Sequence, residues 1–194
     1  MNAKINNKTL LAFAVATFLP AGTSLAATTS GGTVNFSGSV VTSACAISAG
    51  SSNVNVDLGE VRTAALSTPN SEVSAGKTFS IALEDCDIRD VSASTSTNPI
   101  TQSTVSITFD GTPDVADPTT LAVGSNGGTS FAQNVSIRLY DEQGKLLSLG
   151  TAADPIALRK DSNTLNFSAK YFSMKGGATA GDASAVATYT VTYS

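Results

Sequence analysis

The side chains of this sequence that could do chemistry are mostly carboxylates, and their spacing does not build a recognisable active site. Asp85 and Asp87 flank Cys86, and Asp141 precedes Glu142. Adjacent residues along a strand point to opposite faces, so solvated loops and turns explain these acids better than catalytic pairs do. The chain contains no histidine, the commonest general base and zinc ligand, and no Gly-x-Ser-x-Gly motif. The sequence therefore predicts a protein that is not an enzyme.

A metal or cofactor site is equally weakly indicated. Asp110, Asp114 and Asp117 share one loop and are a candidate for a weak calcium site, but their spacing does not match an EF-hand loop. Nothing in the sequence predicts a cofactor.

The first 26 residues are typical of a cleavable export signal. Lys4 and Lys8 precede a short apolar run, and small residues end the segment at Ala26. The alternative is a membrane anchor, although about 20 apolar residues are needed to span a bilayer comfortably. Cleavage would leave 168 residues (194 minus 26), enough for one domain, with 9 basic and 15 acidic residues. This net charge of −6 argues against binding to nucleic acid.

Cys45 and Cys86 are the only cysteines. In an exported chain, a single pair is most simply one disulfide. The alternative is a metal or redox pair, which the wide spacing and the absence of a Cys-x-x-Cys motif disfavour.

Alternation of polar and apolar residues predicts the elements that must carry these side chains. Beyond 31–40, the alternating segments are 53–61, 77–84, 104–110, 133–140, 164–173 and 187–193. Turns rich in glycine and proline separate them, and helical periodicity is limited to a possible single turn at 62–66. The predicted fold is an all-β sandwich of about seven strands with immunoglobulin-like size and spacing.

The first alternating segment has Val34, Phe36, Gly38 and Val40 on one face. Its simplest interpretation is an ordinary first strand, because a strand with one apolar face must bury that face against something. Glycine within a strand weakens it, so Gly38 suggests a close approach by another chain segment.

Several stretches resemble subunits of chaperone–usher pili, above all the type 1 fimbrial major subunit. They are Gly-Thr-Val-Asn-Phe-Ser-Gly-Ser-Val-Val-Thr-Ser-Ala-Cys at 32–45, Val-Asp-Leu-Gly-Glu-Val-Arg-Thr at 56–63, Leu-Glu-Asp-Cys-Asp at 83–87 and Ala-Lys-Tyr-Phe at 169–172. Gly181, the fourteenth residue from the C-terminus, and Tyr193, the penultimate residue, are similar to that family's chaperone-recognition signature. The resemblance covers essentially the whole chain after the signal.

The resemblance implies an incomplete immunoglobulin-like sandwich that a donated strand completes. Residues 27–40 would be an N-terminal donor-strand extension and 41–194 the pilin domain. Val34, Phe36, Gly38 and Val40 would enter the next copy of the chain, building a head-to-tail fibre. Gly181, Tyr189, Val191 and Tyr193 would be read by a periplasmic chaperone before assembly at an outer-membrane usher.

The implied function is that of a structural subunit of a cell-surface fimbrium used in adhesion, reached through the periplasm. The alternatives are a minor pilin or a carbohydrate-binding adhesin module. Adhesins of this type carry an additional N-terminal lectin domain and no donor arm. The sequence contains no tryptophan, the best side chain for stacking on a sugar.

Overall fold

The computed structural model describes residues 32–41, 43–88, 104–124 and 130–194. The chain divides into two units, Met1–Ser39 and Val40–Ser194. The predicted export signal lies outside the described residues. Among the residues that are described, no helix has both the length and the apolar character needed to cross a membrane.

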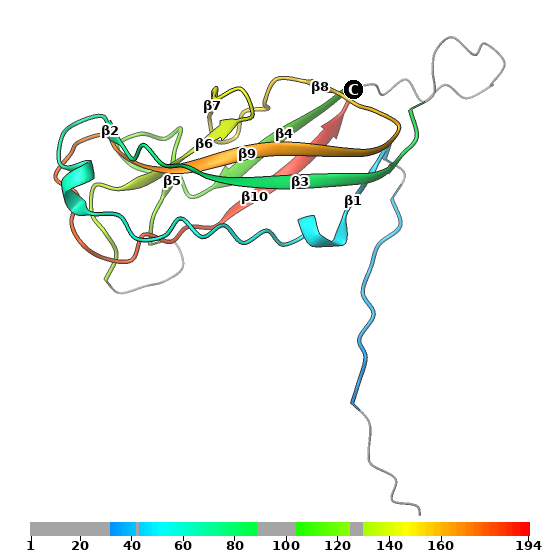
Figure 1. Ribbon diagram of the computed structural model, residues 1–194, viewed down its shortest axis with the longest axis horizontal. Helices are drawn as coiled ribbons and strands as arrows, with labels where there is room; N and C mark the ends of the chain where they lie inside the picture. The colour runs from blue at the N-terminus through cyan, green and yellow to red at the C-terminus, as the bar shows by residue number, and fades with distance from the viewer. Residues whose placement is uncertain (1–31, 42, 89–103, 125–129) are drawn as a thin grey trace, which may run out of the picture. The chain divides into compact units, whose positions relative to one another are not determined.

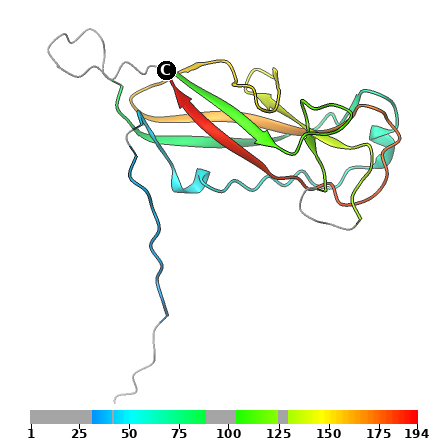
Figure 2. The ribbon, with the colours of Figure 1, turned by 180° about the vertical axis from the view of Figure 1, so that it is seen from behind.

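The second unit is a sandwich of two antiparallel sheets, seen from its two sides in Figures 1 and 2. The larger sheet has the order β1 (Ala46–Ile47), β3 (Lys77–Cys86), β9 (Asp161–Ser173), β6 (Ser136–Asp141) and β5 (Leu121–Ala122). Two short strands extend it: β2 (Ser71–Glu72) pairs with β9, and β7 (Leu146–Leu147) pairs with β6. The smaller sheet has the order β10 (Ala187–Tyr193), β4 (Thr104–Gly111) and β8 (Ile156–Ala157). Two 3₁₀ turns, η1 (Ala49–Ser51) and η2 (Thr63–Leu66), complete the described elements.

The core lies between the two sheets because each long strand turns its alternating apolar residues inward. Val105, Ile107 and Phe109 of β4 are all buried. Phe79 of β3 pairs with Phe167 of β9 across the larger sheet, and their ring centroids lie 5.6 Å apart. Phe109 from the smaller sheet packs edge-on against Phe167 at 5.1 Å. These rings tie the two layers together, which confirms the predicted sandwich.

The predicted disulfide is confirmed. Cys45, immediately before β1, is bonded to Cys86 at the end of β3, and both residues are buried. The backbone N–H of Asp87 donates to the carbonyl of Ala44 at 2.9 Å beside it. The disulfide therefore fixes the start of the sandwich to one of its central strands.

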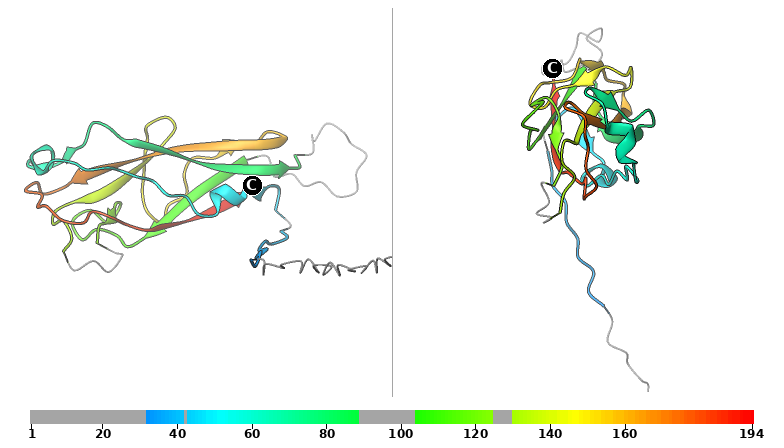
Figure 3. Two further views of the ribbon diagram at one scale, coloured as in Figure 1. Left: turned by 60° about the horizontal axis from the view of Figure 1, so that its bottom comes forward. Right: turned by 90° about the vertical axis from the view of Figure 1, so that its left-hand side faces the viewer.

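One predicted strand, residues 53–61, is wrong. Residues 53–61 run as an extended segment between the layers, yet they belong to neither sheet (Figure 3, left). Their alternation is real, since Val54, Val56 and Leu58 are half-buried while their neighbours are exposed. The missing feature is a neighbouring strand. By contrast, the single turn predicted at 62–66 is present as η2.

The acidic loop has no metal-binding geometry. The Asp114 carboxylate accepts hydrogen bonds from the N–H groups of Ala116 (2.9 Å) and Asp117 (3.1 Å). The Asp117 carboxylate pairs with Arg138 at 3.3 Å. Throughout the described part of the chain, no three potential ligand side chains are grouped around a common point. The acids organise their own loop instead.

A polar network covers the outer face of the larger sheet. Glu72 of β2 pairs with Lys170 of β9 (3.0 Å) and with Arg138 of β6 (3.8 Å). The Tyr140 hydroxyl donates to the second Glu72 oxygen. The guanidinium of Arg138 also lies over the Phe172 ring, 3.2 Å from its centroid. Three strands are therefore tied together on the face that points away from the core.

Candidate functional site: a groove between two open walls

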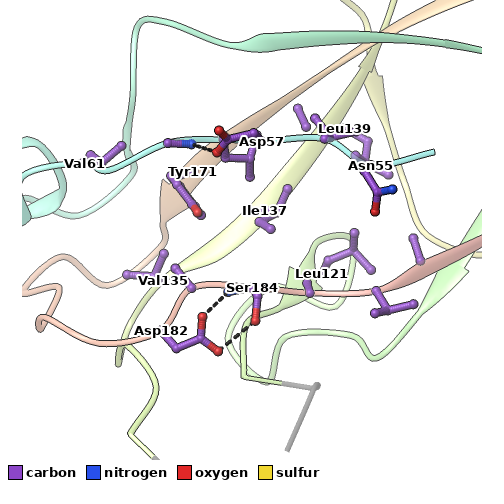
Figure 4. Close-up of a pocket in the computed structure, with 18 of the residues that line it drawn as sticks. Asn55, Asp57, Val61, Leu121, Val135, Ile137, Leu139, Tyr171, Asp182 and Ser184 are labelled. Atoms are coloured by element: carbon purple, nitrogen blue, oxygen red, sulfur yellow. Dashed lines mark hydrogen bonds between the residues drawn. The ribbon is translucent and has the colours of Figure 1, made fainter. Parts of the chain in front are cut away.

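A groove of about 1180 Å³ opens in the side of the sandwich. One wall is the extended segment 53–61, and the other is the segment 178–186 together with the start of β10. Figure 4 shows the two walls facing each other, with Asn55 and Asp57 on one and Asp182 and Ser184 on the other.

The first wall has unused backbone hydrogen-bonding groups. Residues 53–61 make no backbone-to-backbone hydrogen bond with any other described residue. The one bond here is local: the Gly59 N–H donates to the Asp57 carboxylate at 2.8 Å, in a turn that the positive φ of Gly59 (68°) requires. Unpaired N–H and C=O groups form a template for another strand.

The second wall, residues 178–186, forms its backbone hydrogen bonds with the domain on the side that faces away from the groove. The Asp182 N–H donates to Ser130 O (2.9 Å), and Ala132 N–H donates to Asp182 O (2.8 Å). Gly181 makes this contact possible, because a Cβ at that position would lie 2.5 Å from the backbone of Phe131 and Ala132. No bond runs from this wall across the groove to 53–61. The predicted signature glycine therefore has a packing role within its own chain.

The floor of the groove is the core itself. Apolar side chains from both sheets reach it: Phe79, Ile81, Phe109, Leu121, Val135, Ile137, Leu139 and Ala169. Ile137 lies between the two walls in Figure 4. An inserted segment would therefore meet core side chains beneath it and open backbone beside it.

Tyr171 adds a hydroxyl to this apolar floor. Burial raises the pKa of Tyr171, and the carboxylates of Asp182 and Asp57 raise it further. The two aspartates come from opposite walls, so the floor at Tyr171 lies in a negative field. The Tyr171 hydroxyl donates to no described residue. It remains available to a segment bound in the groove.

The predicted C-terminal site residues lie on β10 and face inward. Tyr189, Val191 and Tyr193 are half-buried, whereas the residues between them are exposed. The Tyr189 hydroxyl donates to Ser51 O (2.7 Å), and the Tyr193 hydroxyl donates to Cys45 O (3.3 Å). Burial raises the pKa of both tyrosines. The two rings thus bridge the smaller sheet to the start of the domain, while Tyr189 also lines the groove.

The N-terminal site residues have the opposite environment. Val34, Phe36 and Val40 are 74%, 92% and 102% exposed, and the described residues 32–41 form no strand. A Cβ placed on Gly38 would meet nothing within 4 Å. Their apolar face is unburied in an isolated copy of the chain.

The groove and the N-terminal segment offer complementary surfaces. Burying three apolar side chains in a groove is worth about 1.5–3 kcal/mol each, or roughly 5–9 kcal/mol together. Each ladder hydrogen bond to an open wall adds about 0.5–1.5 kcal/mol. The arrangement suits the capture of an extended strand.

Sequence reasoning identified Gly181, through the family resemblance, but neither the rest of the wall 178–186 nor the acidic pair around Tyr171. The wall is made of Ala, Thr, Gly, Asp and Ser until Val186, so it has no apolar alternation to mark it. That run of small residues was the only available signal.

Comparison with known proteins gives a consistent result. The family model described as "Fimbrial protein" matches residues 34–194. The chain is 38% identical over 170 residues to the type-1 fimbrial protein A chain of Escherichia coli K12, covering 87% of this chain and 86% of the relative. It is 34% identical over 188 residues to the major MR/P fimbria protein of Proteus mirabilis, covering 96% and 98%.

Solved structures resemble it as well. The crystal structure of the P pilus rod subunit PapA has a TM-score of 0.57 at 27% identity, covering 78% of this chain and 100% of that one. A Burkholderia pseudomallei antigen and type I fimbria protein has a TM-score of 0.55 at 27% identity, covering 77% and 88%.

Proposed function

Because this chain belongs to the fimbrial protein family and is a structural subunit of a fimbria, we propose that its copies join by exchanging strands. Residues 27–40 of one copy enter the groove of the next and complete its sandwich. Each copy would donate its N-terminal strand to one neighbour and accept a strand in its groove from another. This contact is heterologous and does not close on itself, and such contacts build fibres.

The observation that carries this proposal is the open groove wall. Residues 53–61 present one inward apolar face and a row of unpaired backbone groups. An exposed edge of this kind is an aggregation hazard unless it is covered. The N-terminal segment has a matching alternation, and its side chains Val34, Phe36 and Val40 are exposed. A single strand inserted at each junction would pair the open backbone of the wall and bury the apolar face of the N-terminal segment.

Within the arm, we assign Val34, Phe36 and Val40 to the groove floor. Gly38 falls on the same face and meets a place where the floor leaves no room for a side chain. Asn35, Ser37 and Ser39 face outward, where polar side chains remain hydrated. The donor role explains why a segment with apolar alternation precedes the disulfide-bonded domain yet forms no strand in the described residues 32–41.

A subunit with an open groove needs protection before assembly. We infer that it passes through the periplasm bound to a chaperone that lends a strand, and that an outer-membrane usher adds it to the fibre. Tyr189, Val191 and Tyr193 lie on the edge strand beside the groove, and Gly181 lies in its wall, which supports their use as the chaperone-recognition surface.

The decisive test is deletion of residues 27–40 from the exported form. Electron microscopy of cells expressing this variant should reveal no fibres, because the donor strand is gone while the groove is intact. The matched control replaces Asn35, Ser37 and Ser39 with alanine, which keeps the apolar face and should keep the fibres. Fibres of normal length from the deletion variant would refute strand donation.

Gly38→Leu tests the fit of the arm. The isobutyl group should block insertion and reduce fibre yield at least about tenfold, since overpacking of a close-fitting site costs roughly 1–3 kcal/mol or more. The folded domain should be unaffected, because a Cβ at Gly38 has no neighbour there. A fibre yield equal to that of the unaltered chain would remove Gly38 from the proposed contact.

A further inference from the structure

The groove carries two negative charges that the domain does not neutralise. Asp57 lies on one wall and Asp182 on the other. Asp57 accepts from the Gly59 N–H, and Asp182 accepts from the Ser184 hydroxyl at 2.7 Å. Neither forms an ion pair with a lysine or arginine in the described part of the chain. Both carboxylates are therefore held in place by neutral donors and not by a basic side chain of the described residues.

The remaining charged residues of the groove cancel. Glu60 and Arg62 line it at the end of the first wall, one negative and one positive. Asp57 and Asp182 are thus the excess charge, and they lie on both sides of the space that an inserted strand would occupy. A low-dielectric floor beneath them focuses their field into that space.

The chain's own arm matches this field by carrying no charge. Residues 27–40 contain no Asp, Glu, Lys or Arg, and they lie within a longer uncharged stretch that runs from residue 9 to residue 56. The outward positions Asn35, Ser37 and Ser39 are polar but neutral. In a strand they would lie level with the exposed residues of the flanking walls, where Asp57 and Asp182 are found.

We propose that Asp57 and Asp182 are specificity-determining residues that make the groove reject donor strands bearing carboxylates and admit neutral ones. The inference rests on the strand exchange proposed above and adds to it a rule for partner choice. The groove would therefore prefer the uncharged arm of another copy of this chain to the acidic segments of other exported proteins. Like charges placed together suppress wrong partners more than matched charges strengthen right ones.

The test uses full-length mature chains whose arms differ only in outward charge. One variant carries Asn35→Asp, Ser37→Asp and Ser39→Asp, and the other carries lysine at the same three positions. Both changes lie in the exposed arm, so the folded domain is left intact. Fibre growth at low salt, followed by light scattering, should be about fivefold slower for the aspartate arm, and this difference should shrink at high salt. The lysine arm should grow no more slowly than the unaltered arm.

The groove variant Asp57→Asn with Asp182→Asn should restore most of the lost rate to the aspartate arm. Its matched control is Glu84→Gln with Glu142→Gln, which removes two exposed carboxylates that do not line the groove. That control should leave the slow growth unchanged if the effect is local and not a matter of total charge. Equal rescue by the two double variants would overturn the proposal, as would growth of the aspartate arm at the normal rate.

The outcomes separate this inference from strand exchange itself. If the unaltered chain forms fibres that require residues 27–40, strand exchange stands whatever the charged arms do. If those fibres grow equally fast with aspartate and lysine arms at low salt, only the charge rule fails.

Discussion

Two segments on opposite sides of the groove have similar sequence patterns and different partners. Both β10 and residues 53–61 alternate apolar with polar residues, and both turn the apolar face inward. β10 pairs with β4 over seven residues, from Ala187 with Gly111 to Tyr193 with Val105. The segment 53–61 pairs with nothing that is described.

The comparison separates two kinds of information in a strand. Alternation determines which face is buried, because the side-chain period is two residues. It does not specify which chain supplies the hydrogen-bonding neighbour. In β10 the neighbour is local to the domain; in 53–61 it is absent, and an exchanged strand from another copy is the proposed partner. A subunit can therefore fold while one of its extended segments has no hydrogen-bonding neighbour in the described part of the chain.

The largest expected effect concerns the aromatic core beneath the groove, where Phe167 packs against Phe79 and Phe109. Phe167→Ala should lower the free energy of unfolding of the isolated subunit by about 3–5 kcal/mol through lost burial and a residual cavity. Urea unfolding of the mature chain measures it. The matched variant Phe36→Ala, in the arm, should leave that free energy unchanged and reduce fibre formation instead. Equal destabilisation by both would erase the distinction between the two regions.

The next largest expected effect on the stability of the folded subunit comes from the disulfide. Cys45→Ala with Cys86→Ala should cost about 2–5 kcal/mol of subunit stability, because the unfolded chain is no longer constrained. The midpoint of urea unfolding should fall, and the shift should match that of the unaltered chain under strong reductant. An unchanged midpoint would show that the packing of β1 on β3 suffices without the cross-link.

The sequence revealed the closed part of the fold better than the open part. Strands β3, β4, β6, β9 and β10 were predicted because their alternating faces are buried within the same copy. The very short strands β1, β2, β5, β7 and β8 were missed, since two residues carry no periodicity. The wall at 53–61 was predicted as a strand because pattern alone does not reveal the absence of a neighbour.

Some residues of the candidate site could likewise be predicted from the sequence, whereas others could be found only in the folded structure. Val34, Phe36, Gly38 and Val40 were recognisable from alternation and family resemblance. The backbone contact that requires Gly181 depends on Phe131 and Ala132, about fifty residues earlier in the chain, so it could only be found in three dimensions. Asp57 and Asp182 likewise lie on opposite sides of Tyr171 only because the fold brings two distant segments of the chain together.

A smaller effect is expected in the open wall. Val56 is only half-buried in the isolated subunit, so Val56→Ala should cost the isolated subunit about 1 kcal/mol or less. If an arm closes over the wall, the same change should cost more in the fibre, roughly 1–2 kcal/mol, because the side chain is then fully covered. Denaturant midpoints of the isolated subunit and of intact fibres give the two values. A loss that is the same in both would mean that the wall stays open after assembly.

The smallest effect lies on the outer face of the larger sheet, where Tyr140 donates to Glu72. Burial, together with the hydrogen bond to Glu72 and its charge, raises the pKa of Tyr140 from 10.0 to about 12. The folded state then holds the phenol proton more tightly than the unfolded state, so this stabilisation is complete below pH 10 and is lost as the pH rises toward about 12. Unfolding free energies measured from pH 9 to pH 12 should fall more steeply for the unaltered chain than for Tyr140→Phe, which has no proton to lose. Parallel pH profiles would contradict the link between Tyr140 and Glu72. Because the groove lies between the sheets and this network lies outside them, Tyr140→Phe should leave the rate of fibre growth at neutral pH unchanged.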